Sequence, residues 1–305
     1  MEYVQTPVVQ IEEERFNEYG IELFLKREDL TDPIISGNKY RKLLYNLEAA
    51  REAGHTTLLT FGGAYSNHIH ATAYAGYKFG FNTIGVIRGE ESLPLNPTLT
   101  DAAAYGMEFY YISRTAYREK YQSELLQHFQ DRFGEFYLVP EGGSNALAVK
   151  GCAQILSVDE KNFDYYCCAC GTGGTISGIV ASLEGEKEVI GFPALKNGSF
   201  LMKDIEKLLE QYSERKYDNY HLNTDYHFGG YAKWDLQLIS FINRFYQKHH
   251  IGLDPVYTGK LLFGIYDLAE RGFFRRESKI LAIHTGGLQG IRGFNDRFGA
   301  LIQTS

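Results

Sequence analysis

Short apolar runs alternate with amphipathic stretches along almost the whole chain. Each run is rich in Leu, Ile, Val, Phe or Tyr, and the stretch after it repeats its apolar residues every three or four positions, as a helix packed on one side does. The runs predict strands at residues 22–26, 57–61, 82–88, 108–112, 136–140, 165–170, 189–192 and 279–284. The amphipathic stretches predict helices at residues 40–53, 68–79, 98–105, 117–133, 174–183, 201–212, 234–249 and 259–271.

This alternation predicts an α/β fold in which helices cover both faces of parallel sheets. Ligands of such folds bind beyond the carboxyl ends of strands, so we expect the informative residues in the loops that follow strands. Four groups of residues there have unusual composition. They are residues 36–42, residues 61–68, residues 170–175, and the pair of segments 254–260 and 282–287.

The loop at residues 170–175 carries the most specific chemical signal. It reads Cys-Gly-Thr-Gly-Gly-Thr, follows a predicted strand and opens a predicted helix. Small residues at a helix N-terminus leave backbone N–H groups free to bind a phosphate. The glycine spacing does not fit the dinucleotide fingerprint, and no Lys-Ser/Thr pair follows as in a Walker loop. A phosphate site is therefore favoured, with a plain tight turn as the alternative.

The loop at residues 61–68 contains Gly62-Gly63 and then Ser66-Asn67-His68. Ser66 can cap the following helix, but capping does not account for three polar residues in succession. Residues 36–42 place three cations at the start of a helix, which opposes the helix dipole. Those cations are either exposed side chains or part of a functional site.

Two residues near the C-terminus have both a structural and a functional interpretation. His284 ends the last predicted strand and is either a hydrogen-bonded core histidine or a catalytic group. Thr258 stands where a residue would cap the helix at 259–271.

Composition narrows the class of protein. The 305 residues are 44% hydrophobic, which excludes a disordered chain. The net charge is 31 − 38 = −7, which disfavours a nucleic-acid or anionic-membrane partner. We find no apolar stretch of the roughly 18 residues that a membrane helix needs. The N-terminus lacks the pattern of a secretory signal.

The four cysteines, Cys152, Cys167, Cys168 and Cys170, are expected to be reduced, buried thiols, with a redox or metal role as the alternative. Reduced thiols predict a cytoplasmic protein. No cluster with metal-ligand spacing is visible, so no metal requirement is expected.

Taken together, these segments resemble the pyridoxal-phosphate enzymes of fold type II, the tryptophan synthase β-subunit type. The similar branch holds 1-aminocyclopropane-1-carboxylate (ACC) deaminase and D-cysteine desulfhydrase. The resemblance covers most of the chain. It rests on residues 26–30, 37–43, 66–68, 171–175, 253–260 and 284–287, in that order.

The resemblance implies a two-domain enzyme, in which residues 1–42 and 150–305 form a large cofactor-binding domain and residues 43–149 form a small one. It also implies pyridoxal 5′-phosphate as cofactor, a small amino acid as substrate, and a homodimer.

The resemblance also implies roles for single residues. Lys39 matches the lysine that holds the cofactor as an aldimine, and Asn67 matches the residue that bonds the ring oxygen. Ser66 matches a serine for carboxylate binding or nucleophilic work, and Tyr257 matches an active-site tyrosine beside the cofactor. Lys39, Ser66 and Tyr257 are therefore the catalytic candidates. Thr285 matches the residue near the pyridine nitrogen. The phosphate cradle is Gly171, Thr172, Gly173, Gly174 and Thr175, and the substrate-binding candidates are Ser66, Asn67, His68, Tyr231, Tyr257 and Thr258.

The two branches differ in chemistry. D-Cysteine has an α-proton that Lys39 can abstract, and β-elimination then gives sulfide, pyruvate and ammonia. ACC has no α-proton, and opening its ring benefits from a protonated pyridinium, which a carboxylate near the nitrogen favours. The deaminases have Glu at the position of Thr258, Leu at that of Thr285 and Gln at that of His68. The resemblance therefore implies a lyase acting on D-cysteine or a related D-amino acid. ACC deaminase, giving 2-oxobutyrate and ammonia, and a non-catalytic cofactor-binding protein are the alternatives.

Three features depart from the family pattern. Tyr65 stands where Gln is common and His70 near where Arg is usual, and both are expected near the substrate end of the site. Residues 212–234 match weakly, and their many aromatic side chains predict a solvated rim or a subunit contact.

Overall fold

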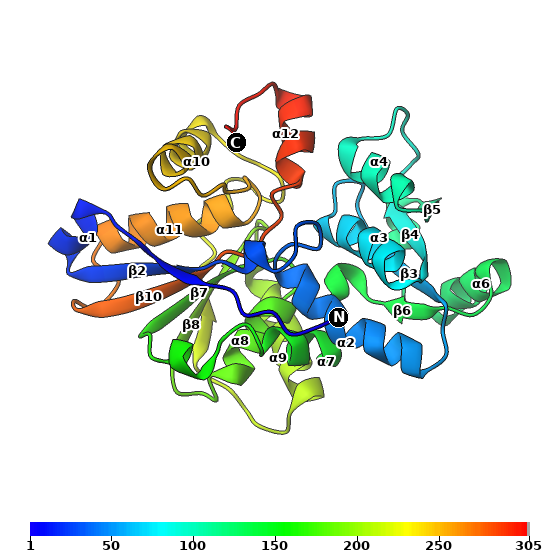
Figure 1. Ribbon diagram of the computed structural model, residues 1–305, viewed down its shortest axis with the longest axis horizontal. Helices are drawn as coiled ribbons and strands as arrows, with labels where there is room; N and C mark the ends of the chain where they lie inside the picture. The colour runs from blue at the N-terminus through cyan, green and yellow to red at the C-terminus, as the bar shows by residue number, and fades with distance from the viewer. Residues whose placement is uncertain (304–305) are drawn as a thin grey trace.

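Two sheets, each covered by helices, make up the molecule (Figure 1). The computed structural model describes residues 1–303. In the larger sheet the β1–β2 pair is antiparallel and the other pairs are parallel, which confirms the predicted α/β class. Its strands, in spatial order, are β1 (Val8–Ile11), β2 (Ile21–Lys26), β10 (Ser278–Ile283), β7 (Tyr165–Cys170), β8 (Glu188–Pro193) and β9 (Tyr220–Leu222).

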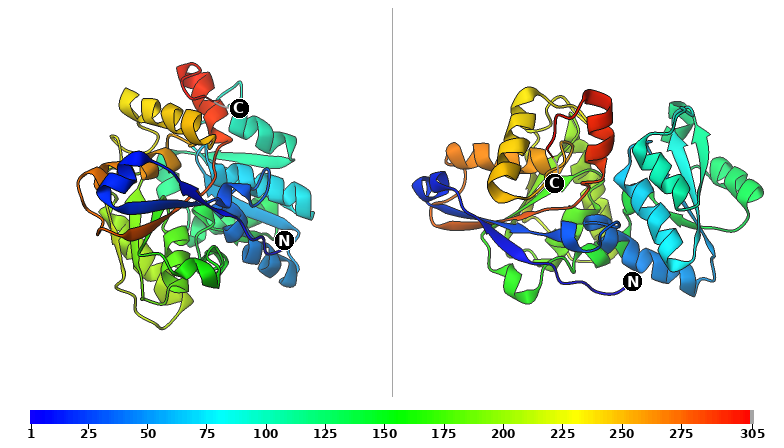
Figure 2. Two further views of the ribbon diagram at one scale, coloured as in Figure 1. Left: turned by 60° about the vertical axis from the view of Figure 1, so that its left-hand side comes forward. Right: turned by 45° about the horizontal axis from the view of Figure 1, so that its top comes forward.

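The smaller sheet is wholly parallel and is set to one side of the larger one (Figure 2). Its strands, in spatial order, are β5 (Met107–Ile112), β4 (Asn82–Arg88), β3 (Thr57–Gly62) and β6 (Tyr137–Val139). All four lie within residues 43–149, and the strands of the larger sheet lie outside that range. The division into two domains at these boundaries stays a prediction.

Helices fill the connections between strands and cover the sheet faces (Figure 1). Helices α10 and α11 pack on one face of the larger sheet, and α7, α8 and α9 pack on the other. The α-helices are α1 (Glu14–Tyr19), α2 (Asn38–Glu52), α3 (Asn67–Phe79), α4 (Pro97–Ala104), α5 (Arg114–Arg118), α6 (Ser123–Phe133), α7 (Ala146–Cys152), α8 (Gly174–Ser182), α9 (Leu201–Tyr212), α10 (Leu236–His249), α11 (Thr258–Glu270) and α12 (Gly290–Phe298). Short 3-10 turns are η1 (Glu28–Leu30), η2 (Glu141–Gly143), η3 (Val158–Lys161) and η4 (Gly198–Phe200).

Strand β7 explains the cysteine-rich run. It lies in the interior of the larger sheet, and alternate residues face opposite cores. Cys167 packs toward α10 and α11, whereas Cys168 and Cys170 pack toward α7, α8 and α9. All four cysteines are buried and unpaired, and burial raises the pKa of the Cys152 thiol to about 11 and that of Cys170 to about 12. The prediction of buried structural thiols is confirmed.

One predicted helix is wrong and several short elements were not predicted. The helix at 117–133 is divided into α5 and α6. Between them, Lys120 forms an ion pair with Glu141 at 3.1 Å, and the Tyr121 hydroxyl accepts a hydrogen bond from the backbone N–H of Glu141. These contacts hold a turn where the sequence pattern would continue the helix. The elements not predicted are β1, α1, α7, β9 and α12.

Within residues 1–303, no helix is both long and apolar enough to cross a lipid bilayer. In the same range, no group of three or more His, Cys, Asp or Glu side chains is placed to hold a metal ion.

Candidate functional site

A cavity of about 500 Å³, the inner chamber, lies where the loops after several strands converge. It is bounded by the start of α2, the β3–α3 loop, η2, the β7–α8 loop and the end of β10. Of the predicted site residues, Gly174 and Thr258 do not line it. The others do: Lys39, Ser66, Asn67, His68, Gly171, Thr172, Gly173, Thr175, Tyr231, Tyr257 and Thr285.

Lys39 enters the chamber from the first turn of α2. Gly37, with φ +75°, precedes this helix, and a Cβ there would lie 1.9 Å from the carbonyl oxygen of Thr285, so the site requires glycine. The backbone N–H of Asn38 donates to that carbonyl at 3.2 Å. The start of α2 is thereby held against the end of β10. Burial, reinforced by the Lys42 ammonium, holds the pKa of Lys39 well below its usual value.

Lys42 is a second lysine of the site and is buried, although its sequence context alone did not indicate a role for it. Its Nζ donates to the Gly142 carbonyl at 3.2 Å, to Ser144 Oγ at 2.9 Å and to Thr172 Oγ1 at 3.4 Å. The side chain is 2% exposed, so it is not one of the solvated lysines considered above. The spacing of the two lysines could have indicated this position. Lys39 lies three residues before Lys42, and residues three apart share a helix face.

The two lysines and the β7–α8 loop suit a phosphate group. Within the described residues neither lysine has a carboxylate at ion-pair distance, and burying an ammonium without an anion is unfavourable. The loop places the N-terminus of α8 in the same chamber, with Gly173 at φ +80°. Any Cβ on Gly174 would lie 3.0 Å from Lys42 Nζ. A phosphate bound there would balance the lysine charge and accept from the N–H groups.

The β3–α3 loop divides its polar residues between capping and the chamber. Ser66 caps α3, and its Oγ accepts from the N–H groups of His68 and Ile69 at 3.2 and 3.4 Å. The hydroxyl proton of Ser66 is not used by the cap. Asn67 Oδ1 accepts a 3.0 Å hydrogen bond from Gln289 Nε2, which fixes the amide at the chamber wall.

The two histidines on α3 and the one after β10 have different surroundings. His68 Nε2 lies 2.7 Å from Thr60 Oγ1, and burial together with Lys39 and Lys42 holds its pKa well below its usual value. His284 is 1% exposed and lies 2.7 Å from the Gly252 carbonyl, so it is a hydrogen-bonded core histidine. His70 was expected near the substrate end, which is wrong. It is buried 3.5 Å from Asp101 of α4 and does not line the chamber.

Two tyrosines form the wall opposite the β3–α3 loop. The rings of Tyr231 and Tyr257 meet edge to face at 6.2 Å. Burial, followed by the neighbouring Tyr231, raises the pKa of Tyr257 well above its usual value, so its phenol stays protonated at neutral pH. A Cβ on Gly171 would lie 3.1 Å from the Tyr257 hydroxyl, so this ring packs closely on the β7–α8 loop.

Asp254, rather than Thr258, caps the start of α11. Asp254 Oδ2 accepts from the N–H groups of Val256 and Tyr257, and its Oδ1 accepts from the N–H and Oγ1 of Thr258, all at 2.8 to 2.9 Å. The prediction that Thr258 itself caps the helix is wrong, because Thr258 is the first residue of α11, and its hydroxyl accepts from the Asp254 N–H and donates to the Asp254 carboxylate. Thr258 is 1% exposed and does not line the inner chamber, whereas Thr285 does.

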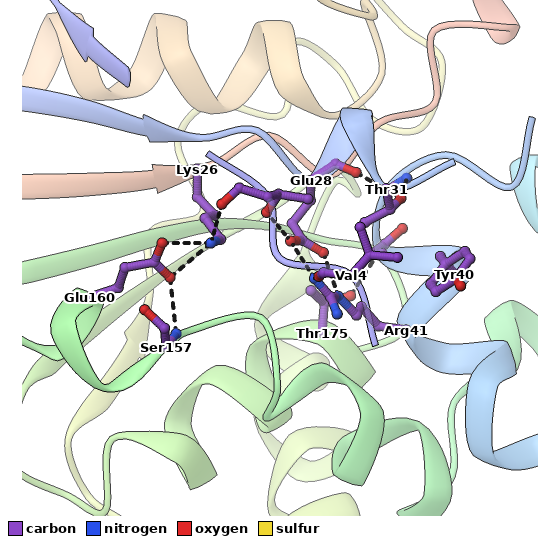
Figure 3. A network of polar contacts seen from close by, with 12 residues as sticks. Val4, Lys26, Glu28, Thr31, Tyr40, Arg41, Ser157, Glu160 and Thr175 are labelled. Atoms are coloured by element: carbon purple, nitrogen blue, oxygen red, sulfur yellow. Dashed lines mark hydrogen bonds and ion pairs between the residues drawn. The ribbon is translucent and has the colours of Figure 1, made fainter. Parts of the chain in front are cut away.

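A buried polar network supports the helix that carries Lys39 (Figure 3). Arg41 donates to the Glu28 carboxylate through Nε at 2.8 Å and Nη2 at 3.0 Å, and both side chains are 0% exposed. Thr6 donates to the same carboxylate at 2.6 Å. Lys26 continues the network by bonding the Thr6 carbonyl and the Glu160 carboxylate. The network connects α2 to the N-terminal segment and to η3.

A second cavity, the outer chamber, adjoins the inner one and has a volume of about 700 Å³. Asn67, Arg88, Tyr231 and Tyr257 line both chambers, so the two spaces share part of their walls. Tyr65, 43% exposed, also lines both chambers, and its expected place near the substrate end stays a prediction.

Comparison with known protein families gives one match over most of the chain. The family described as "Pyridoxal-phosphate dependent enzyme" matches residues 1–286. That range includes each residue of the inner chamber named above.

Individual relatives are similar over most of their length. A Pyrococcus horikoshii protein with the provisional name 1-aminocyclopropane-1-carboxylate deaminase is 31% identical over 295 residues, covering 93% of this chain and 90% of the relative. An Arabidopsis thaliana protein named bifunctional D-cysteine desulfhydrase/1-aminocyclopropane-1-carboxylate deaminase, mitochondrial, is 29% identical, covering 93% of this chain and 76% of the relative. A crystal structure described as that of an ACC deaminase homologue superposes with a TM-score of 0.84 at 29% identity, covering 98% of this chain and 94% of the other.

Proposed function

The chain belongs to the family of pyridoxal-phosphate-dependent enzymes, and from this premise we propose that it is a lyase that eliminates the β-substituent of D-cysteine or a related D-amino acid. Its cofactor is pyridoxal 5′-phosphate, and its fold is type II. The products proposed for D-cysteine are sulfide, pyruvate and ammonia.

The chain's residues suit a binding role for each part of the cofactor. Lys42 and the N-terminus of α8 would hold the phosphate, and Asn67 would bond the ring oxygen. Lys39 would hold the cofactor covalently. When bound, the cofactor's ring withdraws electrons from the substrate's α-carbon.

Proton transfer at the α-carbon is the proposed work of Lys39. Because its pKa is held well below the usual value, Nζ is available as a neutral base closer to neutral pH than an exposed lysine. The unused proton of Ser66 can be donated to the substrate carboxylate. The protonated phenol of Tyr257 can donate a hydrogen bond near the departing group.

One observation carries the choice of D-cysteine over ACC. At the positions that the resemblance assigns to the pyridine nitrogen stand two neutral side chains, Thr285 in the chamber wall and Thr258 with its hydroxyl donated to Asp254. The nearby Asp254 carboxylate is already engaged by three backbone N–H groups. Because neutral side chains stand at both positions, we infer that elimination after α-proton removal is favoured over ring opening.

ACC deaminase is the second candidate, and the names of the relatives favour it. A non-catalytic cofactor-binding protein is the third. The presence of Lys39, Ser66 and Tyr257 around one chamber argues against the third, because cofactor binding alone does not need all of them.

The test is a side-by-side assay of purified holoenzyme with D-cysteine, L-cysteine and ACC, following sulfide and the identity of the keto acid. We expect sulfide and pyruvate from D-cysteine, with little product from the other two. Faster release of 2-oxobutyrate from ACC would reverse the ranking. A bound cofactor whose spectrum none of the amino acids changes would support the non-catalytic alternative. The homodimer stays a prediction, to be measured by sedimentation equilibrium.

A further inference from the structure

The outer chamber is lined by four arginines from both sides of the cavity. Arg88 ends β4, Arg114 and Arg118 lie on α5, and Arg297 lies on α12. This concentration of positive charge occurs in a chain whose net charge is −7. A cavity wall lined by one sign of charge raises the local concentration of ligands of the opposite sign.

The chain itself does not neutralise these arginines. Among residues 1–303, none of the four donates a hydrogen bond to the protein or forms an ion pair with a carboxylate. The one carboxylate in the chamber lining, Asp254, accepts from backbone N–H groups and Thr258 instead. Arg292 provides the contrast. It lies on the same helix as Arg297 but outside the chamber, and it pairs with Asp101 at 2.8 Å.

Arg88 lies where the two chambers meet. It lines both of them, and its Nη2 lies 3.5 Å from the place that a Cβ on Gly63 would take. Its guanidinium also stacks over the Tyr117 ring, 5.5 Å from the centroid, which gives it a supported orientation. A substituent that extends from the inner chamber into the outer one therefore meets Arg88 first and the other arginines beyond it.

We propose that the substrate carries a second negative charge at or beyond its β-carbon, and that the outer-chamber arginines bind this group. The inference rests on the proposed function, because it assigns the β-substituent that leaves. A thiol or a ring methylene is small and has no need of a 700 Å³ chamber with four guanidiniums. The α-carboxylate is common to all candidate substrates and is assigned to the β3–α3 loop. Sulfate, phosphate and carboxylate groups all present negatively charged oxygens, which accept hydrogen bonds from the N–H groups of a guanidinium.

The reaction balances for an anionic ester of D-serine. The Cα–H bond breaks and its proton passes to Lys39 Nζ, and the Cβ–O bond breaks with the electron pair leaving on the oxyanion. The electrons of the Cα–H bond form the Cα=Cβ double bond. One water then completes the hydrolysis to pyruvate and ammonia. No oxidant or reductant is needed.

The test compares two probes of similar skeleton and different charge, D-serine O-sulfate and O-acetyl-D-serine, on the holoenzyme. Because sulfate and acetate differ as leaving groups, the quantity measured is the ratio of their kcat/KM values. We expect Arg88→Gln to lower that ratio about tenfold, mainly through KM for the sulfate ester, as loss of one charge-assisted hydrogen bond does. The pair Arg114→Gln and Arg118→Gln should lower it further. Arg244→Gln, which removes an exposed arginine of α10 that does not line the chamber, should leave it unchanged.

A binding measurement separates this inference from the proposed function. The absorbance of the bound cofactor is titrated with each ester, which reports affinity whether or not turnover follows. Sulfide from D-cysteine together with an unchanged ratio in Arg88→Gln would overturn the arginine assignment and leave the proposed lyase standing. If no compound is turned over, the lyase fails, and tighter binding of the sulfate ester that requires Arg88 would still support the anion site. Equal binding by wild type and variant would overturn it. Gel filtration provides a further check. If Arg88→Gln changed the elution volume of the protein and left the ratio of the two kcat/KM values unchanged, the arginines would be assigned to a contact between two copies of the chain, which also contradicts the proposal.

Discussion

The inner and outer chambers share part of their walls but hold positive charge in opposite ways. In the inner chamber, Lys39 is half-buried and Lys42 is buried, and a network of partnered groups behind them, centred on Glu28 and Arg41, fixes their helix. In the outer chamber the cations are exposed arginines that, within the described chain, have no carboxylate partner. The first arrangement is rigid and specific to one bound group, and the second can adapt to substituents of different shape. The chemistry is therefore expected to depend on the inner chamber and the choice of substrate on the outer one.

The most damaging change to the inner chamber is Lys39→Ala. We expect pyruvate formation from D-cysteine to fall by roughly a thousandfold or more, because both the covalent attachment and the general base are lost. Cofactor absorbance and pyruvate release measure the two effects separately. The matched control is Lys207→Ala, an exposed lysine of α9. Turnover at the parent rate in Lys39→Ala would remove Lys39 from the mechanism.

The next largest effect concerns the network behind α2. Glu28→Gln leaves the buried Arg41 charge unpaired, and the free energy of unfolding should fall by about 3–5 kcal/mol in urea titrations. Glu22→Gln breaks an exposed pair with Lys279 at 3.7 Å and should cost less than about 1 kcal/mol. Equal losses from the two variants would show that the buried network does not stabilise α2 as described. Because Glu28→Gln could unfold the chain, Glu28→Leu combined with Arg41→Met provides a second variant, which should recover part of the loss.

A smaller effect tests the coupling between the two lysines. Lys42 lowers the pKa of Lys39, so Lys42→Met should raise that pKa and move the acid limb of kcat/KM for D-cysteine to higher pH. The same variant should weaken cofactor binding, since the phosphate loses a buried cation. Lys150→Met, an exposed lysine on α7, should leave both properties as in the wild type. A limb that stays in place in Lys42→Met would mean that burial alone sets the pKa of Lys39.

The smallest effect concerns the pH dependence of stability. The folded protein holds the pKa of His68 well below the value of 6.5 expected in the unfolded chain. The unfolded state therefore binds more protons below about pH 6.5, and the free energy of unfolding falls there as the pH decreases, by up to about 1.4 kcal/mol per pH unit. His68→Gln should flatten this part of the profile, whereas His128→Gln, on the exposed face of α6, should keep it. Urea midpoints between pH 5 and 7 measure the slope, and equal slopes in wild type and His68→Gln would contradict the assignment.

Residue patterns within one loop could be predicted from the sequence, and arrangements built from several elements could not. The glycine turn before α8 and the Ser66 cap of α3 follow from glycine spacing and capping preferences over a few residues. The role of Lys39 was predicted from the family resemblance and stays a prediction. Its neighbour Lys42 looked like a solvated lysine, because burial depends on η2 and α8, which lie about 100 residues or more along the chain.

The outer chamber shows the same limit more strongly. Its arginines come from β4, α5 and α12, and nothing in their local sequence indicates that they meet. The prediction that Thr258 caps α11 was wrong because a second residue, Asp254, can also accept from the N–H groups at the start of this helix. Threonine and aspartate both cap helices, and the Asp254 carboxylate can accept from several N–H groups at once, whereas a hydroxyl serves fewer. Which of them caps α11 depends on the path of residues 254–257.

The central claim is that Lys39, in the inner chamber, removes a proton from the α-carbon of a D-amino acid. The most direct test follows D-cysteine carrying deuterium at Cα with the holoenzyme, and compares kcat/KM with that of the unlabelled compound. We predict slower turnover of the labelled substrate and loss of its label to water, and we expect Lys39→Ala to show neither measurable turnover nor loss of the label. Equal rates for the two substrates, with the deuterium retained in the unreacted substrate and ACC converted faster than either, would contradict the account.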